Sequence, residues 1–264
     1  MVEGTRRPLV HLYREAMPEP TYASVNGLEL YYEVHGSGRP LVLLHGGLLT
    51  IDSNFGSMIP LARNHKVVAV EMQGHGHTAD IDRDMTLDNF ADDTVRLLGQ
   101  LGIDEADFFG YSLGGSVSLT VLTRHPNLVG KLVLASTPKR PDDFASEGQL
   151  APDRMPTTAD GKQWEEEYRP VAPDPERFGE LMARLTATVG AIEGWSNEQL
   201  RAIRAPTLIL IGDKDFMSIE HAAQLVRLIP NAQLAVLPNA THVEMTRRPD
   251  QVLAMVAAFL EAST

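Results

Sequence analysis

The 264-residue sequence contains no cysteine, which excludes disulfide bonds and thiolate chemistry. Basic residues are also scarce, since 23 Lys and Arg stand against 35 Asp and Glu and give a net charge of −12. A surface of this sign repels phosphate backbones, so we expect no nucleic-acid partner. No apolar run approaches the roughly 20 residues of a transmembrane helix, so we expect no membrane partner either.

The first residues do not resemble a secretory signal, because they contain no apolar core and no small-residue cleavage site. They carry charges and three prolines, and we expect an N-terminal extension over residues 1–21. The overall composition, 43% hydrophobic and 22% charged, is that of an ordinary globular domain. Together these features predict a cytoplasmic protein.

Short apolar runs bounded by turn residues alternate with longer helical patterns. The runs cover residues 28–34, 41–45, 67–71, 107–111, 131–135, 207–211 and 232–237. Helical periodicity fills residues 86–102 and 220–229 and returns from Pro249 to the end. Such alternation predicts an α/β fold whose mostly parallel sheet is covered by helices on both faces.

Residues 137–204 break the alternation, because they are polar and proline-rich and contain no strong strand. Helix-like stretches occur at residues 164–168, 178–188 and 196–203. We therefore predict a helical cap over residues 137–204, inserted into a core domain formed by residues 22–136 and 205–264.

The sequence GYSLGG at residues 110–115 places Ser112 between glycines. It follows the apolar run DFFGY and opens a helical pattern, which is the strand–turn–helix setting of a nucleophile elbow. The start of a helix favours developing negative charge. We predict that Ser112 is a nucleophile, the alternative being a buried serine in a tight turn.

A serine hydroxyl needs a base, which a carboxylate orients. His242 follows the last predicted strand and reaches the same sheet edge as Ser112, although it also fits a surface loop. Asp213 and Asp215 both follow the strand at 207–211, and the residues alone leave either as the acid.

Two backbone N–H groups are needed for the oxyanion. Leu113, directly after the nucleophile, is one predicted donor. Gly47, in the loop after the strand at 41–45, is the other, with Leu48 as the second choice.

Five pieces of the sequence together resemble the α/β-hydrolase superfamily, in its esterase-like branch with a helical cap. They are HGG (45–47), EMQGHGHTA (71–79), GYSLGG (110–115), LILIGDKD (208–215) and NATHVEM (239–245). The resemblance covers about residues 22–262 and implies an eight-stranded sheet. It favours Asp215 as the acid, three residues after Gly212. An acid after the earlier strand, as in some members, is not available because that place reads LASTPKR.

Three other histidines invite a different interpretation. His75 and His77 could form a metal pair, but the resemblance implies a turn in the pocket wall, which here begins with Glu71 where relatives usually have aspartate. His45 precedes the oxyanion glycines and is expected to be structural. We predict no metal and no cofactor.

Apolar side chains near the triad are expected to bind the substrate. The predicted substrate-binding residues are Leu48, Tyr111, Trp164, Phe216, Met217 and Val243, with Leu49 also expected near the triad. In the cap, the helical spacing allows either pocket lining or cap packing for Trp164, Tyr168, Phe178, Met182 and Trp195. An anionic substrate would need a charge from Arg154 or Arg169.

The sequence thus predicts a cofactor-independent serine hydrolase that cleaves a small, fairly apolar carboxylic ester or lactone through an acyl-enzyme. C–C-bond hydrolase and perhydrolase activity remain open on the same triad, as does a ligand receptor with little turnover. Serine at the elbow excludes the aspartate-dependent haloalkane dehalogenases and epoxide hydrolases. The expected partner is a small molecule, and a homodimer is left open.

Overall fold

The computed structural model describes residues 21–138 and 153–262. Apart from Thr21, the expected N-terminal extension lies outside the described residues, as do residues 139–152 of the expected cap. The predicted limits of the extension, core and cap stay a prediction. No helix in the described ranges is long and apolar enough to cross a lipid bilayer.

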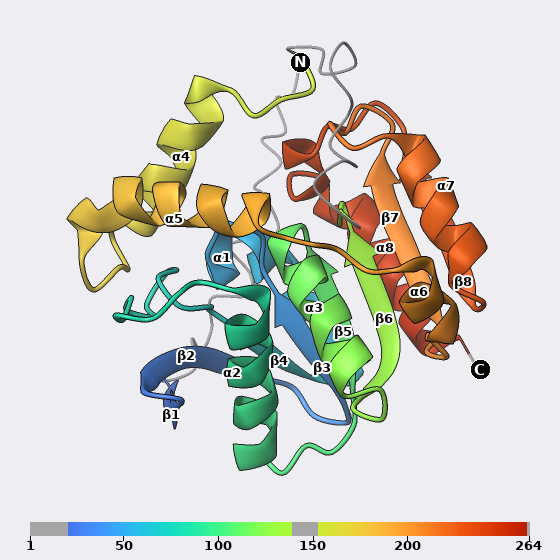
Figure 1. The fold of residues 1–264 in the computed structure, drawn as a ribbon, viewed down its shortest axis with the longest axis horizontal. Coiled ribbons are helices and arrows are strands. Elements are labelled where there is room, and N and C mark those ends of the chain that lie inside the picture. The colour runs from blue at the N-terminus through green and yellow to red at the C-terminus, as the bar shows by residue number, and fades with distance from the viewer. Residues whose placement is uncertain (1–20, 139–152, 263–264) are drawn as a thin grey trace, which may run out of the picture.

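An eight-stranded sheet forms the centre of the molecule (Figure 1). Its strands are β1 (Thr21–Val25), β2 (Leu28–His35), β3 (Arg39–Leu44), β4 (His65–Val70), β5 (Ala106–Tyr111), β6 (Val129–Ala135), β7 (Thr207–Gly212) and β8 (Ala232–Leu237). They are ordered β1-β2-β4-β3-β5-β6-β7-β8. The pairs β1–β2 and β2–β4 are antiparallel and the others are parallel, which confirms the predicted mostly parallel sheet.

Strand β1 was not among the predicted strands. It pairs with β2 through a hairpin turn at Asn26 and Gly27, which have φ of 50° and 82°. Asn-Gly tolerates positive φ at both central turn residues, which is what a two-residue hairpin requires. The turn signal is therefore present in the sequence, although TYASV is a weak strand by itself.

Helices cover both faces of the sheet. They are α1 (Ile51–Phe55), η2 (Gly56–Arg63), α2 (Leu87–Gln100), α3 (Leu113–Arg124), α4 (Thr158–Tyr168), η4 (Pro175–Arg177), α5 (Phe178–Gly190), α6 (Asn197–Ala202), α7 (Ile219–Leu228), η5 (Val243–Met245) and α8 (Pro249–Glu261). Along β3, Val42 and Leu44 belong to the apolar core that also contains residues of α2, α3 and α7, whereas Leu41 and Leu43 belong to the core that contains residues of α1, η2 and α8. Because side chains alternate between the faces of a strand, an all-apolar strand builds both cores.

In Figure 1, helix α5 lies above α1 and ends beside the upper end of α3, with α4 farther from the sheet. Leu185 of α5 faces Gly47 after β3, where a Cβ added to the glycine would lie 3.6 Å from its Cδ1. Helix α6 instead contacts α7. Thus α5 is the element that lies over the loop at the carboxyl end of β3.

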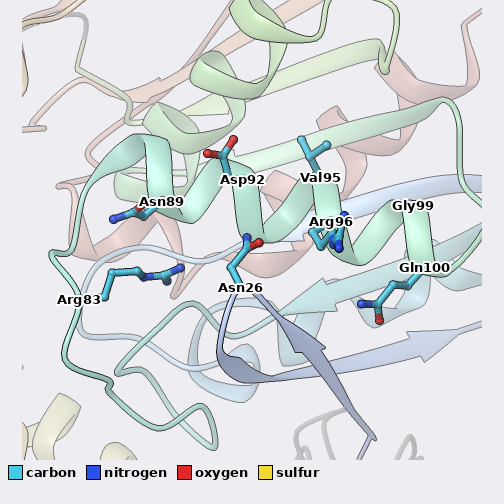
Figure 2. A pocket seen from close by; sticks show the side chains of 8 residues that line it. All are labelled: Asn26, Arg83, Asn89, Asp92, Val95, Arg96, Gly99 and Gln100. Atoms are coloured by element: carbon cyan, nitrogen blue, oxygen red, sulfur yellow. The ribbon is translucent and has the colours of Figure 1, made fainter.

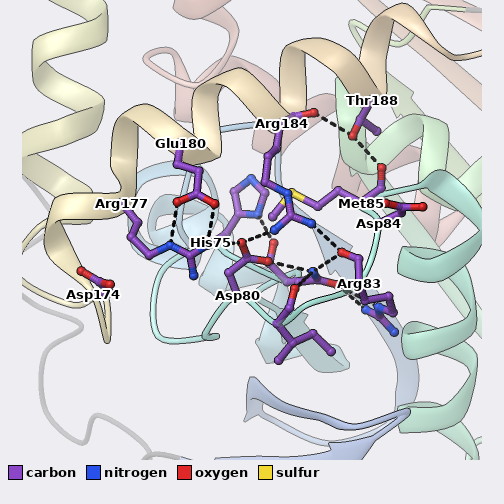
Figure 3. A network of polar contacts seen from close by, with 12 residues as sticks. His75, Asp80, Arg83, Asp84, Met85, Asp174, Arg177, Glu180, Arg184 and Thr188 are labelled. Atoms are coloured by element: carbon purple, nitrogen blue, oxygen red, sulfur yellow. Dashed lines mark hydrogen bonds and ion pairs between the residues drawn. The ribbon is translucent and has the colours of Figure 1, made fainter.

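A polar network ties α5 to the loop between β4 and α2 (Figure 3). Asp80 accepts hydrogen bonds from Arg184 and, at 3.1 Å, from Arg177. One turn after Arg184, Thr188 donates to the carbonyl of Met85 at 2.6 Å. The Asp80 side chain is only 10% exposed, so water screens these ion pairs less than it would at an open surface. The network fixes α5 relative to the sheet.

Candidate active site

Ser112 occupies the sharp turn between β5 and α3. Its φ of 51° and ψ of −114° are strained for a residue with a side chain. Neighbouring backbone holds this conformation, because the Ser112 N–H donates to the carbonyl of Ala135 at 2.8 Å and its own carbonyl accepts from the N–H of Ser116 at 3.1 Å. The turn presents the Ser112 hydroxyl at the start of α3.

Two glycines make this turn sterically feasible. A Cβ on Gly110 would lie 2.4 Å from the carbonyl oxygen of Gly114. A Cβ on Gly114 would lie 1.9 Å from the carbonyl oxygen of Leu44, at the end of β3. Side chains at either position would force the backbones apart, so the glycines of the motif are required by close approach.

The structure brings Ser112, His242 and Asp215 together. Ser112 Oγ lies 3.1 Å from His242 Nε2, and His242 Nδ1 lies 3.2 Å from each carboxylate oxygen of Asp215. These distances suit proton transfer from serine to imidazole and the orientation of the ring by the carboxylate. The three residues follow β5, β8 and β7, whose carboxyl ends meet at one edge of the sheet.

Asp213 and Asp215 have different surroundings. Asp213 is partly exposed and accepts a hydrogen bond from the N–H of Ala240 at 3.1 Å, which holds the loop before His242. Asp215 is fully buried. Burial alone would raise the pKa of Asp215, but the charge and hydrogen bond of His242, with hydrogen bonds from Ser136 and Met217, lower it overall. Asp215 therefore carries the charge that faces the imidazole.

Ser136 is a contact of this carboxylate that the sequence analysis missed. It follows β6 with a φ of 49°, and its Oγ donates to Asp215 Oδ2 at 2.6 Å. The N–H of Met217 donates to Asp215 Oδ1 at 3.0 Å. The available signal was its place in LASTPKR, the segment where some α/β hydrolases carry the acid. A hydroxyl there still reaches the acid of the neighbouring strand.

Two aromatic rings hold His242. The hydroxyl of Tyr111 donates to the carbonyl of His242 at 2.8 Å, and the ring centroid of Phe216 lies 4.2 Å from that of the imidazole. Tyr111 is buried with its hydroxyl on the protein backbone, so it does not reach the substrate-sized cavity described below. Burial raises the pKa of Tyr111 well above its ordinary value, which keeps the hydroxyl a donor.

A cavity of about 290 Å³ opens beside Ser112. The described residues lining it are Gly47, Leu48, Ser112, Leu113, Ser116, Pro138, Met182, Leu185, Thr186, Val189 and Ile192. The loop after β3 and the start of α3 supply Gly47 and Leu113, so the two predicted oxyanion donors share the cavity with the nucleophile. Leu48 also lines it, with a φ of 67° that turns the loop.

The other predicted substrate-binding residues lie around the triad or in the cap, outside that lining. Phe216 covers His242, Met217 is buried beside Asp215, and Val243 begins η5. Trp164 is partly buried and packs against the apolar cores. The structure thus separates residues that support the triad from those that line the cavity.

Helix α5, in the segment predicted to form the cap, supplies one wall of the cavity. Among the cap candidates, Met182 lines it, whereas Tyr168 and Phe178 pack on each other with ring centroids 5.4 Å apart and Trp195 is buried elsewhere. Neither candidate arginine lines the cavity. Arg154 donates to the backbone carbonyl of Asp215 at 3.3 Å, and Arg169 pairs with two exposed glutamates at 2.8 Å.

The histidines near the β4 loop have structural contacts. The N–H of Met72 donates to His45 Nε2 at 3.1 Å, and burial lowers the pKa of His45 well below its ordinary value. His77 Nδ1 lies 2.9 Å from buried Glu71, whose hydrogen bond raises the pKa of His77. His75 Nδ1 instead contacts the carbonyl of Gln73 at 3.0 Å. Across residues 21–138 and 153–262, no three His, Asp or Glu side chains form a group that could hold a metal ion.

A larger cavity of about 690 Å³ lies between α2 and the β1–β2 turn (Figure 2). Ser112, Asp215 and His242 are not among its lining residues. Its walls are the β1–β2 turn, Arg83 and one face of α2. Two of its polar side chains are engaged in the fold, since Asn26 and Arg83 both donate to Asp93 at 2.9 and 3.0 Å. Volume alone therefore does not locate the chemistry, and the smaller cavity at Ser112 is the candidate active site.

Comparison with known proteins finds relatives that match nearly the full length of this chain. A non-heme haloperoxidase from Rhodococcus erythropolis is 27% identical, over 92% of this chain and all of the relative. A 2-hydroxy-6-oxo-6-(2'-aminophenyl)hexa-2,4-dienoic acid hydrolase from Metapseudomonas resinovorans is 26% identical, with 90% of each chain covered. A solved serine hydrolase involved in carbazole degradation superposes with a TM-score of 0.76 at 25% identity, covering 91% of this chain and 98% of that one.

A profile described as the alpha/beta hydrolase family matches residues 41–255, which is most of the chain. That range includes the turn at Ser112 and the loops carrying Asp215 and His242. The sheet has the eight strands, mostly parallel, that the resemblance implied. The chain therefore belongs to the alpha/beta hydrolase family of hydrolytic enzymes.

Proposed function

We propose that this hydrolase cleaves a carboxylic ester or lactone of a small, fairly apolar substrate through an acyl-enzyme on Ser112. The observation that carries the proposal is the connected geometry of Ser112, His242 and Asp215, at 3.1 and 3.2 Å, beside an apolar cavity. A serine with an oriented base in a substrate-sized cavity is the arrangement that acyl transfer requires.

The reaction follows from these positions. Ser112 Oγ attacks the carbonyl carbon while His242 Nε2 accepts its proton, and the buried carboxylate of Asp215 stabilises the imidazolium. The N–H groups of Gly47 and Leu113 donate to the oxyanion of the tetrahedral intermediate. Its collapse expels the alcohol, which takes the proton from His242. A water molecule then gives a proton to His242 as it attacks the acyl carbon. The second tetrahedral intermediate collapses with cleavage of its bond to Ser112 Oγ, which takes that proton back from His242 as the acid is released.

The cavity limits the substrate class. Its volume of about 290 Å³ lies at the lower end of the roughly 300–1,000 Å³ typical of small-molecule sites. No Asp, Glu, Lys or Arg is present among its described lining residues. These two features support a short acyl group without a charge.

The relatives suggest other reactions of the same triad. One is a dienoic acid hydrolase, whose substrate carries a carboxylate, and another is a haloperoxidase. The absence of a charged side chain from the described cavity lining favours the ester over an anionic substrate. C–C-bond cleavage, perhydrolysis and ligand binding without turnover are therefore outcomes of the test below.

The test is a series of p-nitrophenyl esters from acetate to decanoate, with a simple lactone beside them, measured on the wild type and on Ser112→Ala. We expect the highest kcat/KM for the short acyl chains and loss of turnover in the variant. Preference for decanoate would contradict the small cavity. Absence of turnover on every ester and on the lactone would contradict the ester proposal and turn attention to the other reactions.

A further inference from the structure

Ile192 is a buried apolar side chain just after the end of α5. It is 7% exposed, and its backbone N–H donates to the carbonyl of Val189 at 3.3 Å. Although buried, it belongs to neither of the two apolar cores formed by the described residues. Its surroundings are instead two cavities, which meet at this side chain.

The first is the active-site cavity, and the second is a cavity of about 510 Å³. Among the residues that the structure describes, Ile192 alone lines both. The two cavities follow one another along α3, where Ser112 and Ser116 line the first and Thr120 and Thr123 line the second. The end of α5 contributes to both in the same order. Ile192 therefore stands at their boundary.

The active-site cavity belongs to the acyl group of the substrate. The alcohol oxygen must lie beside His242 Nε2, since that nitrogen gives it a proton. Neither His242 nor Phe216, whose ring covers the imidazole, is among the described lining residues of this cavity. The predicted oxyanion donors Gly47 and Leu113 do line it. We therefore assign the alcohol to the His242 side of the nucleophile and the acyl chain to the cavity that ends at Ile192.

The second cavity offers room for hydrocarbon beyond that boundary. Met85 and Trp195 are buried apolar members of its lining. The hydroxyl of Thr188 already donates to a backbone carbonyl at 2.6 Å, so it needs no polar group from a ligand. Two of the charged members, Asp88 and Arg124, pair with each other at 3.1 Å. A chain that passed Ile192 would thus meet apolar side chains and polar groups that already have partners.

We propose that Ile192 ends the acyl-binding site and thereby limits this enzyme to esters of short-chain acids. With isoleucine in place, an acyl chain that extends from Ser112 meets this side chain, and the second cavity is closed to it. A smaller side chain joins the two cavities and admits esters of medium-chain fatty acids. The proposal rests on the ester-cleaving function proposed above, and it makes Ile192 a specificity-determining residue of that site.

The experiment measures the ratio of kcat/KM for p-nitrophenyl octanoate to kcat/KM for p-nitrophenyl butanoate. We expect this ratio to be about tenfold higher in Ile192→Ala than in the wild type, because each methylene that leaves water contributes about a fourfold gain. Ile203→Ala is the matched control, since Ile203 is 4% exposed and lines neither cavity. It should keep the wild-type ratio.

A second pair of esters separates the acyl side from the alcohol side. Butyl acetate and octyl acetate differ only in the alcohol, which lies beside His242. Their kcat/KM ratio should therefore be the same in Ile192→Ala as in the wild type. An equal rise in both pairs of esters would mean that the substitution loosens the whole site, and would overturn the inference.

An unchanged octanoate-to-butanoate ratio in Ile192→Ala would also overturn the inference, while leaving ester hydrolysis in place. Hydrolysis of neither p-nitrophenyl ester by the wild type would instead remove the proposed function, and the inference with it. If the alanine variant fails to fold, Ile192→Val repeats the test with the loss of a single methylene. The ratio should then rise by about two- to fourfold, and no rise would count against the boundary role of Ile192.

Discussion

Asp213 and Asp215 stand two residues apart after the same strand, yet only Asp215 meets the imidazole of His242. The difference is local, since β7 ends at Gly212 and the next turn sends one carboxylate inward and the other toward the loop before His242. Ser136 and the backbone of Met217 then fix both oxygens of the inner carboxylate. At the residue scale, the identity of the acid therefore depends on which groups donate hydrogen bonds to each carboxylate oxygen.

Replacement of the two aspartates tests that assignment. Asp215→Asn should fold but lose on the order of 10⁴-fold in kcat, because the amide favours the wrong imidazole tautomer. Asp213→Asn should keep most of its turnover and lose about 1 kcal/mol of stability, since its acceptor serves the turn. Measurement of kcat and Tm for both variants decides this. The reverse ranking would move the acid to Asp213.

Ser136→Ala should show a pH-dependent loss of stability. The hydrogen bond from Ser136 contributes to the lowered pKa of Asp215. A carboxyl group with a lowered pKa stabilises the fold above its unfolded pKa of about 3.9, and that contribution is lost as the pH falls through the folded pKa. We expect the variant to be less stable than the wild type by about 1–2 kcal/mol at pH 6.

The same difference should shrink as the pH falls below the unfolded pKa of about 3.9 and toward the lowered folded pKa of Asp215, because a protonated carboxyl no longer gains from the hydrogen bond. Urea unfolding at pH 6 and at pH 3 measures it. A constant difference at both pH values would mean that Ser136 acts through packing alone.

At the scale of elements, α5 links the cap to the chemistry. Its residues Met182, Leu185 and Val189 line the cavity, while Arg184 and Thr188 bind the loop that carries Asp80 and Met85. One helix therefore uses separate side chains for the pocket wall and for its own attachment. Loss of these contacts should make the α5 side of the cavity less ordered while leaving Ser112, His242 and Asp215 in place.

Arg184→Met removes the ion pair with Asp80 but keeps a long apolar stem. We expect KM for a short ester to rise several-fold with a smaller change in kcat, because the substrate then meets a less ordered wall. Arg169→Met is the matched control, since its ion pairs with Glu165 and Glu176 are exposed and contribute little. Equal KM values for the two variants would mean that the network does not organise the cavity.

The same elements show what the sequence can and cannot predict. Central strands such as β3 and β4 are predictable because each contains an unbroken apolar run, LVLL in β3 and VVAV in β4. The short helical segments at 51–63 were not predicted, since Gly56 and Pro60 interrupt any long helical pattern there. Helix α5 was predicted, but its periodicity does not say which stripe meets the substrate, because that depends on where the cap rests on the sheet.

The site itself divides in the same way. The glycines around Ser112 and the position of His242 in the loop after the last strand can be recognised in the sequence. The close placement of these two side chains was therefore predictable. Tyr111 and Phe216 were predicted to bind the substrate, yet they contact His242. The direction of each ring depends on neighbours from other strands, which the sequence does not place.

At the scale of the whole molecule, the parallel sheet is what assembles the chemistry. The carboxyl ends of β5, β7 and β8 carry Ser112, Asp215 and His242, of which Ser112 lies 130 positions before His242 and Asp215 lies 27 before it. Strand β3 adds the loop with Gly47. The two apolar cores keep these strand ends in register. The central claim is therefore that one sheet edge forms a serine-based acyl-transfer site under α5.

The most direct test is covalent labelling with a serine-directed fluorophosphonate, followed by intact-mass and peptide mass spectrometry. We predict one phosphonyl adduct per chain, located on Ser112, with loss of esterase activity in proportion to labelling. His242→Ala should label far more slowly, because the hydroxyl then lacks its base. Ester turnover that survives in Ser112→Ala, or a label on another residue in the wild type, would contradict the account.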